Sequence, residues 1–146
     1  MGERKATAVW NGGLTDGSGE IELGSGLFKG SFSFATRMGD EPGTNPEELL
    51  GASLAGCYAM ALNAALEKQG TPASKVNAEA KVFLGKDDSG FKINRIDLFT
   101  SASVPGLSQE DFAAVAEDVK NSCPISRALA ATDIALKAEL SGSATV

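Results

Sequence analysis

The chain of 146 residues contains no histidine. Histidine is the side chain whose ordinary pKa lies closest to neutral pH, and it is the commonest protein ligand of metal ions. Its absence excludes an imidazole general base, Ser-His and Cys-His catalytic pairs, and histidine-ligated metal or haem sites. An enzymatic activity would therefore rest on other side chains, and we expect no bound metal.

Positive charge is scarce as well, with 13 Lys and Arg residues against 19 Asp and Glu residues and a net charge of -6. A surplus of negative charge repels phosphate backbones, so nucleic acid is not an expected partner. The chain also lacks a long uninterrupted apolar run: residues 49–66 form the longest stretch, but Ser53 and Asn63 interrupt it. This stretch predicts a buried helix rather than a membrane span.

Only two cysteines are present, and the first residues, Met-Gly-Glu-Arg-Lys, lack the following apolar segment of a signal peptide. We therefore expect a cytoplasmic protein in which both cysteines are thiols. The composition, with 42% hydrophobic and 22% charged residues, is typical of a globular protein. Because the linker-like stretch 39–45 is too short to separate two domains, we expect a single domain over residues 1–146.

The distribution of apolar residues predicts an α+β fold with an antiparallel sheet. Alternation with a period of two predicts strands, and spacing of three and four residues predicts helices. In chain order, the expected elements are strands over residues 5–10, 19–23 and about 28–34, a helix over 46–68, a hairpin of 75–86 and 93–104, helices over about 108–123 and 124–131, and a last strand over 134–140. The first three strands form a predicted meander.

Local signals mark the ends of the long central helix. Asn45 can cap the free N–H groups of its first turn, and Pro46 has the backbone geometry of a first helical position. Gly70 and Pro72 then end it. Pro124 lacks an N–H donor, so it ends the next helix and begins another. These signals place one cysteine within the central helix and the other at the junction before Pro124.

The two cysteines are the candidates for chemistry, and their contexts differ. Cys57 lies in mid-helix on the same apolar stripe as Leu54, where an unreactive core thiol is the more common case. Cys123 begins the sequence Cys-Pro-Ile-Ser, and the positive end of the short helix that follows would lower its pKa. A simpler interpretation of that motif is a helix break at proline. Neither cysteine assigns a function by itself.

Three charged residues near the loop 39–45 are further candidates. Arg37 is expected at the end of the third strand, where a permanent cation would stand beside mobile backbone. A solvated surface arginine is the more common case. Glu47 and Glu48 fall in the first turn of the central helix, where the helix dipole alone favours carboxylates. Each of these residues therefore has a structural and a functional interpretation.

Four segments resemble the OsmC/Ohr family of osmotically inducible and organic hydroperoxide resistance proteins. They are Thr-Arg at 36–37, Gly-Thr-Asn-Pro-Glu-Glu-Leu-Leu at 43–50, Ala-Gly-Cys at 55–57 and Cys-Pro-Ile-Ser at 123–126. The resemblance spans nearly the whole chain, and the combined spacing is far more specific than any one segment. Because the arginine lies just before the loop, the pattern is closer to the OsmC branch.

The resemblance implies an OsmC-like fold, an antiparallel sheet with a long central helix, assembled as an intertwined homodimer. It implies a thiol peroxidase in which Cys57 is the peroxidatic thiol and Cys123 the resolving thiol, with Arg37 and Glu47 as the activating pair. Organic hydroperoxides would be reduced to alcohols, and hydrogen peroxide less efficiently to water, in oxidative or osmotic stress defence. Such a cycle needs no cofactor, only an external dithiol or lipoyl-type reductant.

Apolar residues around the reactive thiol would favour neutral alkyl or aryl hydroperoxides. Four residues are expected to line the entrance: Phe28, Phe32, Leu54 and Met60. Two other functions remain open at this point. One is a thiol–disulfide redox sensor or carrier that uses the same cysteines without sustained peroxidase turnover. The other is a non-enzymatic stress or binding protein whose cysteines are core residues, which unreactive thiols in the folded protein would indicate.

Helix geometry predicts a site shared between two subunits. Glu47 and Cys57 are ten residues apart, so on one straight helix they are separated by ~15 Å, too far for Arg37 to bridge both from one side. If two such helices cross antiparallel near Ala52, Glu47 of one lies beside Cys57 of the other. Gly51 and Gly56 indicate such a close approach, although packing on the sheet would also explain them. The alternative is a kink near Gly51 within one chain.

Overall fold

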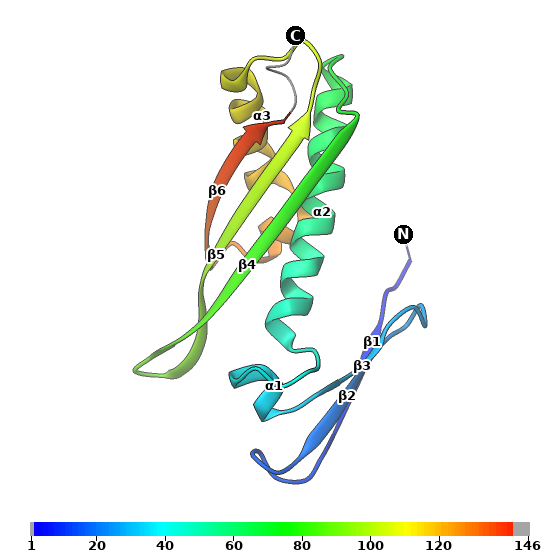
Figure 1. The fold of residues 1–146 in the computed structure, drawn as a ribbon, viewed down its shortest axis with the longest axis vertical. Coiled ribbons are helices and arrows are strands. Elements are labelled where there is room, and N and C mark those ends of the chain that lie inside the picture. The colour runs from blue at the N-terminus through cyan, green and yellow to red at the C-terminus, as the bar shows by residue number, and fades with distance from the viewer. Residues whose placement is uncertain (1, 142–146) are drawn as a thin grey trace. The chain divides into compact units, whose positions relative to one another are not determined.

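The structure is a computed structural model that describes residues 2–141. The chain forms two units, Met1–Leu49 and Leu50–Val146, each built around a three-stranded sheet (Figure 1). Helices accompany both sheets, so the α+β class predicted from the sequence is confirmed. The expectation of a single domain stays a prediction.

The first unit contains the predicted meander. Its strands β1 (Ala6–Asn11), β2 (Ser18–Leu23) and β3 (Lys29–Phe32) pair antiparallel in the order β1-β2-β3. The sheet has little cover: all six residues of β1 are exposed. Its clearest apolar contact joins the rings of Trp10 and Phe32, whose centroids are 5.4 Å apart. This sheet therefore leaves apolar surface open to solvent.

A short helix, α1 (Phe34–Met38), replaces the predicted end of the third strand. The Ser33 hydroxyl accepts a hydrogen bond from the Thr36 N–H at 3.2 Å, and the Thr36 hydroxyl accepts one from the Ser33 N–H at 2.8 Å. This reciprocal capping starts a helix despite the alternating phenylalanines. The prediction that Arg37 stands at a strand end was therefore wrong, because Arg37 lies in the last turn of α1.

The long helix α2 (Pro46–Lys68) begins and ends where the sequence predicts. The Asn45 side chain accepts a hydrogen bond from the Glu48 N–H at 2.7 Å, as a capping residue does. By length and composition α2 is apolar enough to cross a membrane. One stripe of it, however, is completely buried in the core, namely Leu54, Tyr58, Leu62 and Leu66. The helix is thus buried along one stripe rather than on all sides.

The second sheet contains the predicted hairpin, β4 (Lys75–Asp87) and β5 (Gly90–Ser103), and the last strand, β6 (Asp133–Leu140). The strand order is β4-β5-β6, and β6 pairs with β5 in parallel, not antiparallel as predicted. Parallel neighbours need a long crossover connection, and the helices between β5 and β6 provide it. The second sheet is therefore mixed.

Two helices, α3 (Gln109–Ser122) and α4 (Pro124–Ala128), form that crossover. The predicted start of α3 is confirmed, since the Ser108 hydroxyl accepts a hydrogen bond from the Asp111 N–H at 3.1 Å. The predicted start of α4 at Pro124 is also confirmed, but α4 is shorter than expected and ends at Ala128. The chain then continues in turns that lead directly into β6.

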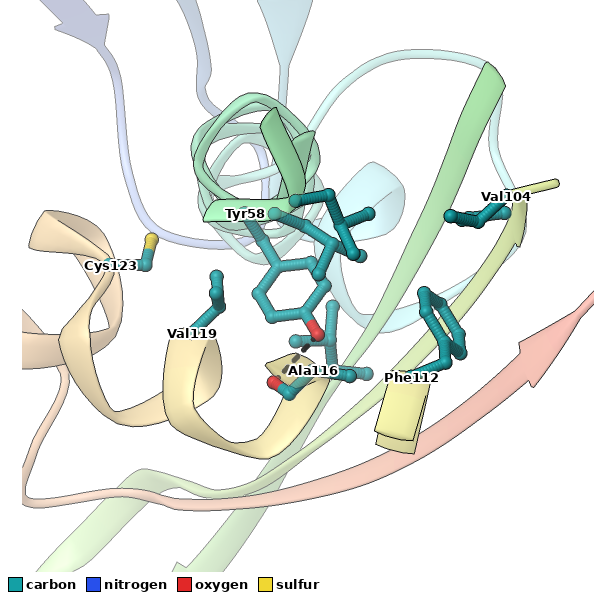
Figure 2. Packing of buried hydrophobic residues seen from close by; sticks show 10 residues of the cluster. Tyr58, Val104, Phe112, Ala116, Val119 and Cys123 are labelled. Atoms are coloured by element: carbon teal, nitrogen blue, oxygen red, sulfur yellow. Dashed lines mark hydrogen bonds between the residues drawn. The ribbon is translucent and has the colours of Figure 1, made fainter. Parts of the chain in front are cut away.

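The core of the second unit lies between its sheet and the helices α2 and α3, which cover the same face (Figure 1). The opposite face carries ion pairs such as Arg95–Asp97. In the core, the Tyr58 hydroxyl donates a hydrogen bond to the Ala116 carbonyl at 2.9 Å (Figure 2). Cys123 lies at the edge of this cluster, next to Val119. The core thereby holds α2 and the α3–α4 junction together.

Candidate active site

The structure brings the two cysteines together. Cys57 is on α2, and Cys123 is the single residue between α3 and α4, where it ends one helix and begins the next. Both are free thiols, and their sulfur atoms are 3.0 Å apart. A thiol can both donate and accept a weak hydrogen bond, so either sulfur can serve as the donor of this contact.

The surroundings of the two thiols differ. Cys57 is half-buried and Cys123 is 1% exposed. Burial, followed by the contact with the Cys123 thiol, raises the pKa of Cys57. Burial also works to raise the pKa of Cys123, but the Cys57 thiol, Ser126 and the Ile125 N–H outweigh it and lower that pKa. Within this unit, the surroundings therefore favour the thiolate form of Cys123 and disfavour that of Cys57.

Ser126 is a polar residue near the thiols to which the sequence assigned no separate role. It is 5% exposed, and its Oγ atom is buried without a hydrogen-bond partner in the described part of the chain. Ser126 lowers the pKa of Cys123 and so favours its thiolate. Within residues 2–141, the neutral Cys123 side chain makes no hydrogen bond that caps α4. The Cys-Pro-Ile-Ser motif was the available signal, since it places a hydroxyl one turn after the thiol.

A second constellation, in the first unit, consists of Arg37 and Glu47. Arg37 Nη2 donates to Glu47 Oε1 at 2.7 Å, and Arg37 Nε lies 3.2 Å from both carboxylate oxygens. Glu47 is 8% exposed, whereas the Arg37 side chain is 39% exposed. The buried carboxylate fixes the plane of the guanidinium. The N–H groups on the opposite edge of the guanidinium stay available to another group.

The loop between α1 and α2 is fixed by hydrogen bonds centred on Thr44. Its N–H donates to the Ser31 carbonyl at 2.9 Å, and its carbonyl accepts from the Thr36 hydroxyl at 2.9 Å. The Thr44 hydroxyl in turn donates to the Glu48 carboxylate at 2.9 Å. Glu48 therefore secures the loop, while its neighbour Glu47 holds the arginine.

The four residues predicted to line a substrate entrance are divided between the two units. Leu54 is 0% exposed because it belongs to the buried stripe of α2, and its place at the entrance stays a prediction. Met60 is 74% exposed, on another side of the same helix. Phe28 and Phe32 belong to the first unit, where both rings are partly buried beside glycines of the meander. Of the two predicted on α2, Met60 alone is accessible.

The two helix glycines have different surroundings. A Cβ atom at Gly51 would lie 3.3 Å from the Ala80 carbonyl oxygen of β4, so Gly51 permits close packing on the sheet. At Gly56, a Cβ atom would meet nothing within 4 Å among the described residues. The sheet thus explains Gly51, and Gly56 remains on an open side of α2.

Comparisons with known proteins identify the family. The sequence profile of the family described as OsmC-like protein matches residues 39–139. Peroxiredoxin OsmC of Escherichia coli strain K12 is 37% identical over 129 residues, which cover 88% of this chain and 90% of that protein. Organic hydroperoxide resistance protein-like 2 of Staphylococcus epidermidis is 29% identical over 126 residues, which cover 84% of each chain.

The fold agrees with the sequence comparison. The crystal structure of the organic hydroperoxide resistance protein OhrB of Bacillus subtilis matches with a TM-score of 0.71 and 27% sequence identity, covering 94% of this chain and 98% of that one. The resemblance seen in the sequence motifs is thereby confirmed by the family profile, a curated relative and a solved structure. The chain therefore belongs to the OsmC-like protein family and is an oxidoreductase of the peroxidase type.

Proposed function

We propose that this protein reduces organic hydroperoxides with its two thiols, Cys57 as the peroxidatic thiol and Cys123 as the resolving thiol. The observation that carries the proposal is the 3.0 Å contact between the two sulfur atoms. At this distance a sulfenic acid on one cysteine is within reach of the other, so a disulfide can close before further oxidation. The names of the relatives, peroxiredoxin and organic hydroperoxide resistance protein, support the same substrate class.

The proposed cycle has three steps. The Cys57 thiolate attacks the outer oxygen of the hydroperoxide, the O–O bond breaks, and the alkoxide leaves and takes up a proton to become the alcohol. The Cys123 thiolate then attacks the sulfur of the Cys57 sulfenic acid, forming the disulfide and releasing hydroxide, which becomes water. An external dithiol or lipoyl-type reductant restores the two thiols. This cycle uses no bound cofactor.

Arg37 is the proposed source of the positive charge that holds the Cys57 thiolate. Burial raises the pKa of Cys57 within its own unit, so the thiolate needs stabilisation from elsewhere. A guanidinium remains ionised at any physiological pH, and it can therefore supply the charge that a chain without histidine cannot obtain from imidazolium. Glu47 supports this role because its carboxylate fixes the guanidinium through three hydrogen bonds.

We also propose a homodimer whose two copies share each site. Large apolar side chains are exposed in both units, including Val9 at 59%, Leu27 at 91% and Met60 at 74%. Burial of such side chains against a second copy would stabilise a dimer. In that dimer, Glu47 of one chain would lie beside Cys57 of the other. We assign the enzyme to oxidative or osmotic stress defence in the cytoplasm, where thiols are kept reduced.

The function predicts sustained turnover with a preference for organic peroxides. With excess dithiol, the protein should consume cumene or tert-butyl hydroperoxide through many cycles per subunit. It should consume hydrogen peroxide about tenfold less efficiently, because apolar contacts add binding energy only for the organic substrates. The net charge of -6 should also disfavour anionic hydroperoxides. The measurement is peroxide consumption at equal concentrations of each substrate.

The outcome separates the candidate functions. The variant Cys57→Ser/Cys123→Ser is the control for peroxide loss unrelated to the thiols. One oxidation per subunit followed by no further consumption would indicate a redox sensor or carrier instead of a peroxidase. Faster consumption of hydrogen peroxide than of cumene hydroperoxide would contradict an apolar substrate site.

A further inference from the structure

The two sulfur atoms of the redox pair differ in their accessibility. Cys57 is half-buried, whereas Cys123 is 1% exposed. In thiol–disulfide exchange the attacking thiolate needs open access to the sulfur with which it forms the new bond. In a disulfide between these residues, Cys57 is therefore the sulfur that an external reductant can reach, and Cys123 is the sulfur that leaves.

A buried hydroxyl accompanies the leaving sulfur. Ser126 Oγ has no hydrogen-bond partner in the described residues, and the residue is 5% exposed. A buried polar atom without a partner is costly and uncommon in folded proteins. Ser126 stands three residues after Cys123, and a side chain at this position points back toward the residue that precedes the helix. The hydroxyl is thus poised for a partner at Cys123.

We propose that Ser126 is a positioning residue for reduction of the disulfide: the external thiolate attacks Cys57, and Cys123 leaves as a thiolate that accepts a hydrogen bond from the Ser126 hydroxyl. The inference rests on the proposed function for the origin of the disulfide. A new S–S bond forms between the reductant and Cys57, the Cys57–Cys123 bond breaks, and its electron pair stays on Cys123. The second thiol of the reductant then attacks its own sulfur in the mixed disulfide and releases the Cys57 thiolate.

The electrostatics of the pair agree with this direction. Burial opposes the Cys123 thiolate, but the Cys57 thiol and Ser126 outweigh burial and lower the pKa of Cys123. Burial raises the pKa of Cys57. The thiol of lower pKa is the better leaving group in thiol–disulfide exchange. In the disulfide, the Cys123 sulfur carries no negative charge. The hydrogen bond from the Ser126 hydroxyl to this sulfur therefore forms only as charge develops on it during cleavage.

The attacked sulfur can be mapped on protein oxidised with diamide. 2-Mercaptoethanol is added to the disulfide form, and the reaction is stopped after short times in denaturant containing N-ethylmaleimide. We expect the mercaptoethanol adduct on Cys57 and the maleimide on Cys123. The adduct on Cys123, or equal amounts on both, would overturn the proposal. Because diamide forms the disulfide without a hydroperoxide, a protein that lacks peroxidase activity still gives this answer.

Replacing Ser126 by alanine tests the hydroxyl itself. We expect a few-fold slower cleavage of the disulfide by 2-mercaptoethanol. In a Cys57→Ser background, we expect the midpoint of Cys123 thiolate formation to rise by about one pH unit. Ultraviolet absorbance follows the thiolate, and the only tyrosine, Tyr58, does not interfere because burial raises its pKa. The variant Ser126→Thr keeps a hydroxyl and should restore both values.

Controls separate positioning from structure. Ser122→Ala is the matched control, because the exposed Ser122 hydroxyl donates to the Asp118 carbonyl in α3 at 2.9 Å. Reduced Ser126→Ala should unfold at the wild-type temperature or above it, since the change removes a buried hydroxyl without a partner. A folded Ser126→Ala protein with unchanged cleavage rate and unchanged thiolate midpoint would overturn the role of Ser126.

Discussion

Replacement of Cys57 by serine should lower the rate of cumene hydroperoxide reduction by about a thousandfold or more. The Cys57 sulfur receives the transferred oxygen in the proposed cycle. A serine hydroxyl has a similar shape, but it does not ionise near neutral pH and cannot be oxidised to the sulfenic acid state. Initial rates with excess dithiol measure the loss.

The companion variant Cys123→Ser should consume one equivalent of peroxide and then stop. Its Cys57 sulfenic acid lacks the partner sulfur that lies 3.0 Å away in the native protein, so excess peroxide should oxidise it to sulfinic acid. Mass spectrometry then shows two added oxygens on the Cys57 peptide. The opposite assignment would follow if the preference of the Leu50–Val146 unit for the Cys123 thiolate decided the roles. Sulfinic acid on Cys123 of the wild type, with Cys57 unmodified, would show that reversal.

Mixing two inactive variants should restore about a quarter of the wild-type activity if subunits share each site. Glu47→Ala frees Arg37 from the carboxylate that holds it at 2.7 Å, and Cys57→Ser removes the nucleophile. Random exchange makes about half of the dimers mixed, and each mixed dimer has one intact site of two. Peroxidase activity after verified subunit exchange is the measurement.

The matched control reverses the expectation. The double variant Glu47→Ala/Cys57→Ser is mixed with wild-type protein under the same conditions. With shared sites, one site of a mixed dimer lacks Glu47 and the other lacks Cys57. Mixed dimers are then inactive. With each site inside one chain, as a kink in α2 would allow, mixed dimers keep one active site. Activity in these mixed dimers, together with no recovery in the first mixture, would rule out sharing.

Most elements of the fold were predictable because their signals are local. Asn45, Pro46 and Gly70 define the ends of α2, and Pro124 separates α3 from α4. Helix α1 was missed because alternating phenylalanines obscured the Ser33–Thr36 capping pair. Helices α3 and α4 form the crossover that lets β6 run parallel to β5. The parallel direction was missed because the apolar periodicity within a strand does not show in which direction its neighbour runs.

The site was only partly predictable from residues. Local sequence gave each cysteine an ordinary structural explanation, and their resemblance to family motifs was needed to suggest a pair. The sulfurs meet because the core packs α2 against α3, a contact between residues 66 positions apart in the chain. The complete burial of Leu54 was not predictable, because apolarity alone does not distinguish a core residue from a pocket residue. The sequence did not single out Ser126, because the burial of its hydroxyl without a partner among the described residues is seen only in the structure.

The central claim is that Cys57 and Cys123 form one redox pair that closes on reaction with a hydroperoxide. Its most direct test is to treat reduced wild-type protein with one equivalent of cumene hydroperoxide and digest it without reductant. We expect the two cysteine peptides to be recovered as one disulfide-linked species, in an amount equal to the cumyl alcohol formed. Recovery of both peptides as separate thiols, with the hydroperoxide unconsumed, would contradict the account.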